Sequence, residues 1–111
     1  MFAFFGQTTL PTGVETPPPP ATALSRCYPN PFNPAVRISF ALREKGSMSL
    51  RIYDVSGRLV RVLVDEVRES GWHEAVWDGR NEGGRPAASG IYFCRMQAPG
   101  YERAEKLVLL K

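Results

Sequence analysis

The sequence IYDVSGRLVRVL, residues Ile52 to Leu63, is the clearest indication of the fold class, because a turn separates two strand-like apolar segments. Residues Met48 to Asp54 alternate between apolar and polar side chains, which is the period of a half-buried strand. Val55-Ser-Gly-Arg58 predicts a tight hairpin in which Gly57 takes a positive φ angle. A partner strand over Leu59 to Val64 follows.

The same texture continues on both sides of this hairpin, and no segment has helical periodicity. Turn residues separate further expected strands, and the loop Arg80 to Pro86 should be exposed and mobile. We expect Trp77 to be the main core side chain. The remaining expected strands are Val36 to Leu42, Trp72 to Trp77, Ile91 to Ala98 and Arg103 to Leu110. Such short strands with hairpin links predict an all-β fold, an immunoglobulin-like antiparallel β-sandwich of about seven strands.

Length and composition allow one domain and little more. The chain has 111 residues, of which 43% are hydrophobic, so a single small core is expected. Residues 1–25 are rich in Pro and Thr, and Pro17 to Pro20 predicts an extended polyproline spacer. This segment is either a linker or a disordered N-terminal segment. The folded domain is expected over residues 26–111.

Charge and hydropathy exclude several classes of partner. The formal net charge is +3, but the basic residues are interspersed with acids and form no dense run, so no nucleic-acid binding is expected. No transmembrane segment is evident. The apolar start, Met1 to Gln7, is too short for a signal peptide. If the protein is exported, its leader belongs to a longer upstream sequence.

The residues that carry chemistry in enzymes are sparse here. His73 is the sole histidine, and a packed or edge position is the simpler interpretation, so we expect no enzyme and no cofactor. Asp54, Asp78 and Glu82 lie at strand ends or turns, where carboxylates accept backbone hydrogen bonds. The run Asp78 to Gly84 is a poor version of a calcium loop, and no metal site is predicted.

Two cysteines and one proline-rich segment complete the inventory. Cys27 and Cys94 lack metal-ligand spacing, and they are either buried thiols or a pair joined in an exported protein. In the segment Tyr28 to Pro34, alternating prolines keep the chain extended and off the central ladder. There Tyr28 and Phe32 are expected to cover the end of the core.

Several blocks, in this order and spacing, resemble the Ig-like domain named after the flagellar hook-capping protein FlgD. That domain often occurs as the type A C-terminal sorting domain of proteins exported by the type IX (Por) secretion system. The resemblance covers about the last 85 residues. The blocks are YPNPFNP (with Tyr28, Pro29, Asn30, Pro31, Phe32), IYDVSGRLVRVL (Tyr53, Asp54, Gly57, Arg58), GWHEAVWDGR (Gly71, His73, Trp77, Asp78, Gly79), SGIYF (Gly90, Tyr92) and KLVLLK (Lys106, Leu107, Leu109).

The resemblance implies a module that the outer-membrane export machinery recognises by its folded surface and C-terminal strand. The module would direct an upstream cargo domain, absent from this chain, through the periplasm to the cell surface or medium. We expect the module to be a monomer. The alternative is a structural Ig-like module for assembly or adhesion, with carbohydrate or matrix contacts through Trp72 and Tyr101. The PNPF sequence, the proline-rich segment and the basic-ended last strand favour sorting.

Overall fold

A computed structural model of the chain describes residues 19–111, and these residues form seven β-strands in two sheets. Turns and irregular segments account for the rest of the described chain, and no helix in it is long and apolar enough to cross a membrane. The strands are β1 (Ala23–Tyr28), β2 (Val36–Leu42), β3 (Gly46–Asp54), β4 (Leu59–Arg68), β5 (Gly71–Trp77), β6 (Gly90–Ala98) and β7 (Tyr101–Leu109).

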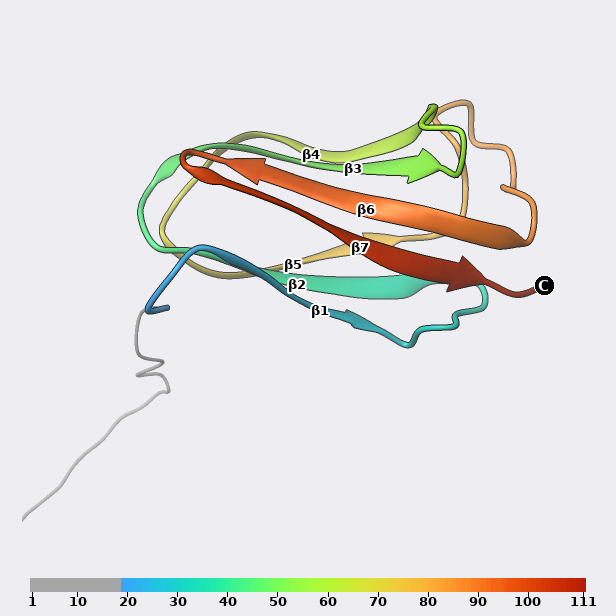
Figure 1. The fold of residues 1–111 in the computed structure, drawn as a ribbon, viewed down its shortest axis with the longest axis horizontal. Helices are drawn as coiled ribbons and strands as arrows, with labels where there is room; N and C mark the ends of the chain where they lie inside the picture. Colours follow the sequence, from blue (N-terminus) through green and yellow to red (C-terminus); the bar gives the residue numbers. More distant parts are fainter. Residues whose placement is uncertain (1–18) are drawn as a thin grey trace, which may run out of the picture.

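The sheets are antiparallel and stack as the two layers of a sandwich (Figure 1). The smaller sheet has the order β1-β2-β5, and the larger has the order β4-β3-β6-β7. Every described ladder between named strands is antiparallel. The predicted all-β, Ig-like sandwich of about seven strands is confirmed.

The core lies between the two sheets, where the alternating apolar residues of both inner faces meet. Strand β2 contributes Val36, Ile38, Phe40 and Leu42, each no more than 1% exposed. Strand β5 shows the predicted alternation, since its odd-numbered side chains turn inward and end in the fully buried Trp77. The inward faces of β3 and β7 are also as expected, and they include Leu50, Ile52, Leu107 and Leu109.

The N-terminal boundary differs from the expectation. Strand β1 starts at Ala23, within the segment assigned to the linker, and pairs with β2 from Ala23 opposite Ala41 to Tyr28 opposite Arg37. A register shift between Leu24 and Arg26 interrupts the alternation of inward and outward side chains in β1. The sequence of β1 therefore lacks the alternation that indicates a strand. Pro17 and Pro18 of the expected polyproline spacer lie outside the described residues, as do residues 1–16.

The loop Arg80 to Pro86 is exposed, as predicted, but it is well bonded. Arg80 and Pro86 form an isolated antiparallel bridge, and Asn81 Oδ1 accepts from Arg85 N at 3.0 Å. Glu82 N donates to the Val60 carbonyl at 3.0 Å. The loop thereby covers part of the free edge of β4, which would otherwise expose unpaired backbone groups.

Candidate functional site at one end of the sandwich

Most of the residues singled out in the sequence gather at one end of the sandwich. Strands β1, β3, β5 and β7 finish at this end and β6 begins there, beside the C-terminus (Figure 1). The five blocks are separated along the chain, but their strands bring parts of all five together. We call this region the C-terminal end of the sandwich. It holds Phe32, Asp54, Trp77, Gly79, Tyr92 and Leu109 together with their neighbours.

Three aromatic rings fill the interior of this end. The ring centroids of Phe32 and Trp77 are 5.4 Å apart, and those of Trp77 and Tyr92 are 5.1 Å apart in an edge-on arrangement. The indole N–H of Trp77 donates to the Arg80 carbonyl at 2.9 Å. Because buried indole and phenol groups need polar partners, these contacts hold the rings in one arrangement. Phe32 covers the end of the core, as predicted.

The phenol of Tyr92 also bonds to the chain that leads into its own strand. Its hydroxyl donates to the Ala88 carbonyl at 2.6 Å. Burial raises the pKa of Tyr92, and the nearby Asp54 carboxylate raises it further. The hydroxyl therefore stays protonated and remains a donor at neutral pH.

The PNPF segment, Pro29 to Phe32, runs along the free edge of the last strand. Phe32 and Leu109 form an isolated parallel bridge. Phe32 N donates to the Val108 carbonyl at 2.9 Å, and Leu110 N donates to the Phe32 carbonyl at 3.0 Å. The segment thus acts as a short extra strand beside β7 and covers part of an edge that would otherwise be open.

Asn30 extends this pairing with its side chain. Asn30 Nδ2 donates to the Lys106 carbonyl at 2.8 Å, and Oδ1 accepts from Val108 N at 3.0 Å. The flanking Pro29 and Pro31 have no backbone N–H to donate, so the asparagine amide supplies the donor and acceptor that a strand neighbour would offer. The alternation of proline with asparagine and phenylalanine therefore has a structural purpose.

One expectation for this segment needs correction. Tyr28 does not cover the core: it is 59% exposed, and the Arg26 guanidinium lies 4.9 Å from its ring centroid. Tyr28 is the last residue of β1, and its pairing with the outward-facing Arg37 turns its ring to the outer face. Beyond the extended conformation expected for it, the segment pairs with a strand almost eighty residues later.

Asp54 holds the β3–β4 hairpin closed. Its Oδ1 accepts from Ser56 N at 2.9 Å, from Ser56 Oγ at 2.6 Å and from Arg58 N at 3.0 Å. The Ser56 hydroxyl bond, followed by the Arg58 amide bond, lowers the pKa of Asp54 below its usual value. Gly57 has the predicted positive φ angle of 86°. Turn chemistry accounts for this carboxylate.

Asp78 and Gly79 form the corner after β5. Asp78 Oδ1 accepts from Arg80 N at 3.0 Å and pairs with Arg61 at 3.3 Å. Gly79 has φ of +77°, and a Cβ there would lie 2.9 Å from the Pro34 carbonyl oxygen. Only glycine allows this close approach between the corner and the end of the proline-rich segment.

Gly71 and His73 lie at the opposite end of the sandwich, near the β4–β5 turn. The His73 ring stacks on Phe40 with centroids 5.2 Å apart, and its Nε2 lies 2.8 Å from the Glu69 carbonyl oxygen. The packed or edge position expected for this histidine is confirmed. In residues 19–111 the structure brings together no three His, Cys, Asp or Glu side chains that could hold a metal ion.

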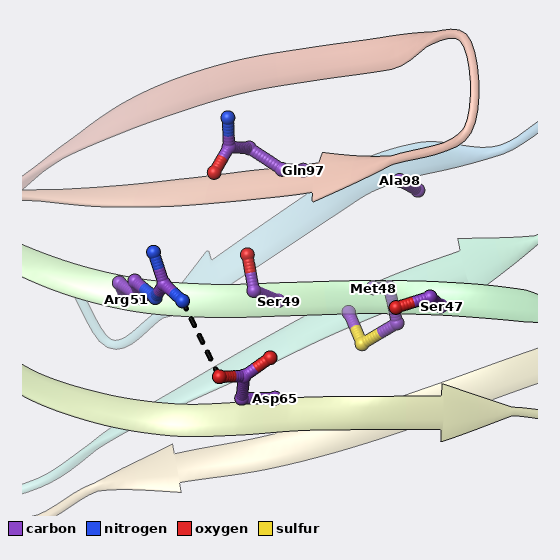
Figure 2. A pocket seen from close by; sticks show the side chains of 7 residues that line it. All are labelled: Ser47, Met48, Ser49, Arg51, Asp65, Gln97 and Ala98. Carbon is purple, nitrogen blue, oxygen red and sulfur yellow. Dashed lines mark hydrogen bonds and ion pairs between the residues drawn. The ribbon is translucent and has the colours of Figure 1, made fainter.

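A shallow groove of about 300 Å³ lies on the outer face of the larger sheet. Figure 2 shows Ser49, Arg51 and Gln97 along it, with Arg51 bonded to Asp65 at 3.3 Å. Small-molecule sites are typically enclosed and mostly apolar. This open, mainly polar groove is instead typical of a solvated sheet face.

The same outer face carries a row of one aliphatic and two aromatic side chains that ends in Lys106, and the sequence alone does not predict this row. The row follows the register across the larger sheet. Tyr53 on β3 lies opposite Leu59 on β4 and Phe93 on β6, and Phe93 lies opposite Lys106 on β7. Leu59 is 44% exposed and Phe93 is 36% exposed. The alternation within β3 and β6 marks Tyr53 and Phe93 as outward-facing, but only strand order and register align them with Leu59 and Lys106 in one row.

The chain was compared with protein-family models, curated proteins and solved structures. The model of the FlgD Ig-like domain family matches residues 32–100. No curated protein matches the chain. The chain is also similar to PorZ of Porphyromonas gingivalis, described as an essential bacterial surface component of the type IX secretion system, with 27% identity and a TM-score of 0.55.

The likeness to PorZ covers 78% of this chain and 11% of PorZ. A dimeric latent PorU from Porphyromonas gingivalis shares the fold at 22% identity and a TM-score of 0.63, over 93% of this chain and 10% of that protein. The chain thus spans about a tenth of the length of either protein. Because the family model matches more than half of the chain, this chain belongs to the FlgD Ig-like domain family.

Proposed function

We propose that this domain is a non-catalytic sorting and anchoring module, which directs a larger exported protein through type IX secretion to the cell surface or medium. The observation that carries the proposal is the pairing of the PNPF segment with the last strand. These are two of the three sequence features that favour sorting over a structural Ig-like module. Their direct contact makes them one structural unit at the C-terminal end of the sandwich.

The physical argument concerns the free edge of β7. A C-terminal strand with an open edge would pair with other chains during export. Asn30 and Phe32 satisfy four edge groups of this strand, from the Lys106 carbonyl to the Leu110 amide. The module can therefore present its C-terminal end to a protein partner as a folded surface. The similarity to a surface component of the type IX secretion system supports this context.

An export assay tests the proposal. Residues 19–111 are fused behind a signal peptide and a fluorescent reporter, because β1 starts at Ala23 and must be included whole. The fusion is expressed in a bacterium with type IX secretion and in an export-deficient strain. We expect reporter at the surface or in the medium only in the competent strain.

Two controls make the result interpretable. A fusion carrying Trp77→Ala, which removes the central core side chain, should stay in the periplasm of both strains. A reporter without the domain should do the same. If the intact, folded fusion is also retained in both strains, the sorting proposal is wrong, and a structural module for assembly or adhesion becomes the better interpretation.

A further inference from the structure

The two cysteines of the chain both point into the space between the sheets. Cys27 on β1 is the register partner of Ile38, and Cys94 on β6 is the register partner of Ile52. Both isoleucines are fully buried. Since directly opposed residues in a ladder point to the same face, both thiols face the core, one from each sheet.

The two thiols are also close along the length of the sandwich. Strand β1 lies beside β7, where Leu24 N donates to the Tyr101 hydroxyl at 2.8 Å and Asn30 bonds to the Lys106 carbonyl. On β1, Cys27 lies between the residues that make these two contacts. On β7, the corresponding stretch contains Glu105.

Glu105 is the direct register partner of Cys94, so it links the two positions. Burial, then the Glu105 charge, raises the pKa of Cys27 to about 11. Burial is the main cause that raises the pKa of Cys94, and the charges of Cys27 and Glu105 raise it further. Both thiols therefore lie within the electrostatic influence of Glu105. Cys94 is buried and Cys27 is half-buried, which leaves Cys27 as the thiol that a reagent meets first.

We propose that Cys27 and Cys94, which are thiols in this structure, form a disulfide across the sandwich in an oxidising compartment. The proposal rests on the proposed export only for that compartment. The Cys27 thiolate attacks the disulfide of an oxidant, either a protein or a small molecule, and releases one thiol of that oxidant. The Cys94 thiolate then attacks the Cys27 sulfur and releases the second. The two cysteines lose two protons and two electrons, and the oxidant's disulfide becomes two thiols.

Such a bond would hold an edge strand of the smaller sheet in place. Strand β1 has one ladder, to β2, and its other edge meets β7 through side-chain contacts such as Leu24 to Tyr101. A bond from Cys27 to Cys94 closes a long loop of chain, which restricts the unfolded state strongly. It would hold the edge strand and the PNPF segment that follows it against the larger sheet.

The test uses the full chain, purified and equilibrated in a buffer of oxidised and reduced glutathione. The protein is then acid-quenched, separated from the glutathione, unfolded, treated with iodoacetamide at mildly alkaline pH and weighed by intact mass spectrometry. We expect a monomer with no alkyl group and a mass about 2 Da below that of the reduced chain, for the two hydrogens lost. Its Tm should exceed that of the dithiothreitol-treated protein by about 10 °C or more.

Cys27→Ser is the matched control. It should take one alkyl group at Cys94, and dithiothreitol should not change its Tm. Two alkyl groups on the oxidised wild-type protein would overturn the proposal, as would glutathione adducts or disulfide-linked dimers in place of the internal bond. The assay contains no secretion machinery, so its outcome is independent of the export result.

Discussion

The side-chain amide of Asn30 forms the hydrogen bonds to the last strand that the backbone of a neighbouring strand would form. Its Oδ1 accepts from Val108 N at 3.0 Å. Its Nδ2 donates to the Lys106 carbonyl at 2.8 Å. Two residues later the backbone of Phe32 repeats the pattern against Val108 and Leu110. A proline-rich segment can thus close a sheet edge when a side chain supplies the donor that proline lacks.

Replacing Asn30 should therefore weaken the domain. Asn30→Ala removes two hydrogen bonds to the strand backbone, and we expect the free energy of unfolding to fall by about 1 to 2 kcal/mol. Urea unfolding measures this change. Asn33→Ala is the control, since Asn33 is an exposed asparagine of the same segment and should change the midpoint little. Equal effects of the two variants would argue against the edge-pairing role.

Gly79 should tolerate alanine less well than another glycine of similar φ. Gly79 and Gly84 have φ angles of +77° and +81°, but only at Gly79 would a Cβ meet backbone, the Pro34 carbonyl oxygen at 2.9 Å. We expect Gly79→Ala to cost about 3 kcal/mol and Gly84→Ala about 1 kcal/mol. Denaturant midpoints of the two variants give the comparison. Similar losses would show that the corner moves freely away from Pro34.

Trp77→Ala should remove most of the stability of the domain. The side chain is fully buried between Phe32 and Tyr92, so its loss leaves a large cavity and costs about 3 to 5 kcal/mol. A small domain has about 5 to 15 kcal/mol in all. Trp72→Ala, at a side chain that is 51% exposed, should lower the free energy of unfolding far less. Unchanged urea midpoints for Trp77→Ala would contradict its central place in the core.

Removing residues 107–111 should abolish the fold. The deletion takes away the fully buried Leu107 and the almost fully buried Leu109, and it leaves the edge of β6 and the PNPF segment without their partner. We expect loss of the near-UV circular dichroism signal and rapid proteolysis. Removing Lys111 alone, an exposed residue beyond β7, should leave both properties close to those of the intact chain.

The hairpin carboxylate predicts a defined acid sensitivity. Because the pKa of Asp54 is lower in the folded protein than its ordinary value of 3.8, its contribution to stability is complete above that value. It is lost as the pH falls through the folded pKa. Urea midpoints of wild type and Asp54→Ala should differ at about pH 7 and converge towards about pH 2. A difference that persists in acid would show that the charge of Asp54 does not matter.

Much of the fold could be predicted from local pattern. Six of the seven strands follow from alternation and turn residues, because the side-chain period of two and the demands of a turn are properties of neighbouring residues. Strand β1 was missed because its bulge near Leu24 and Arg26 breaks that period. Tyr28 and Phe32 are both expected to cover the core when only the local sequence is considered, because both are aromatic residues of the same segment. In the structure only Phe32 is buried.

Six strands, the hairpin turns, the inward faces and the central place of Trp77 follow from the sequence alone, since each depends on residues close together in the chain. The fold is needed to show which distant segments meet: Asn30 with Val108, Gly79 with Pro34, and Cys27 on the sheet opposite Cys94. The physical reason is that edge hydrogen bonds and close backbone approaches carry no periodicity. Their partners become adjacent only when strand order and register bring the two edges together.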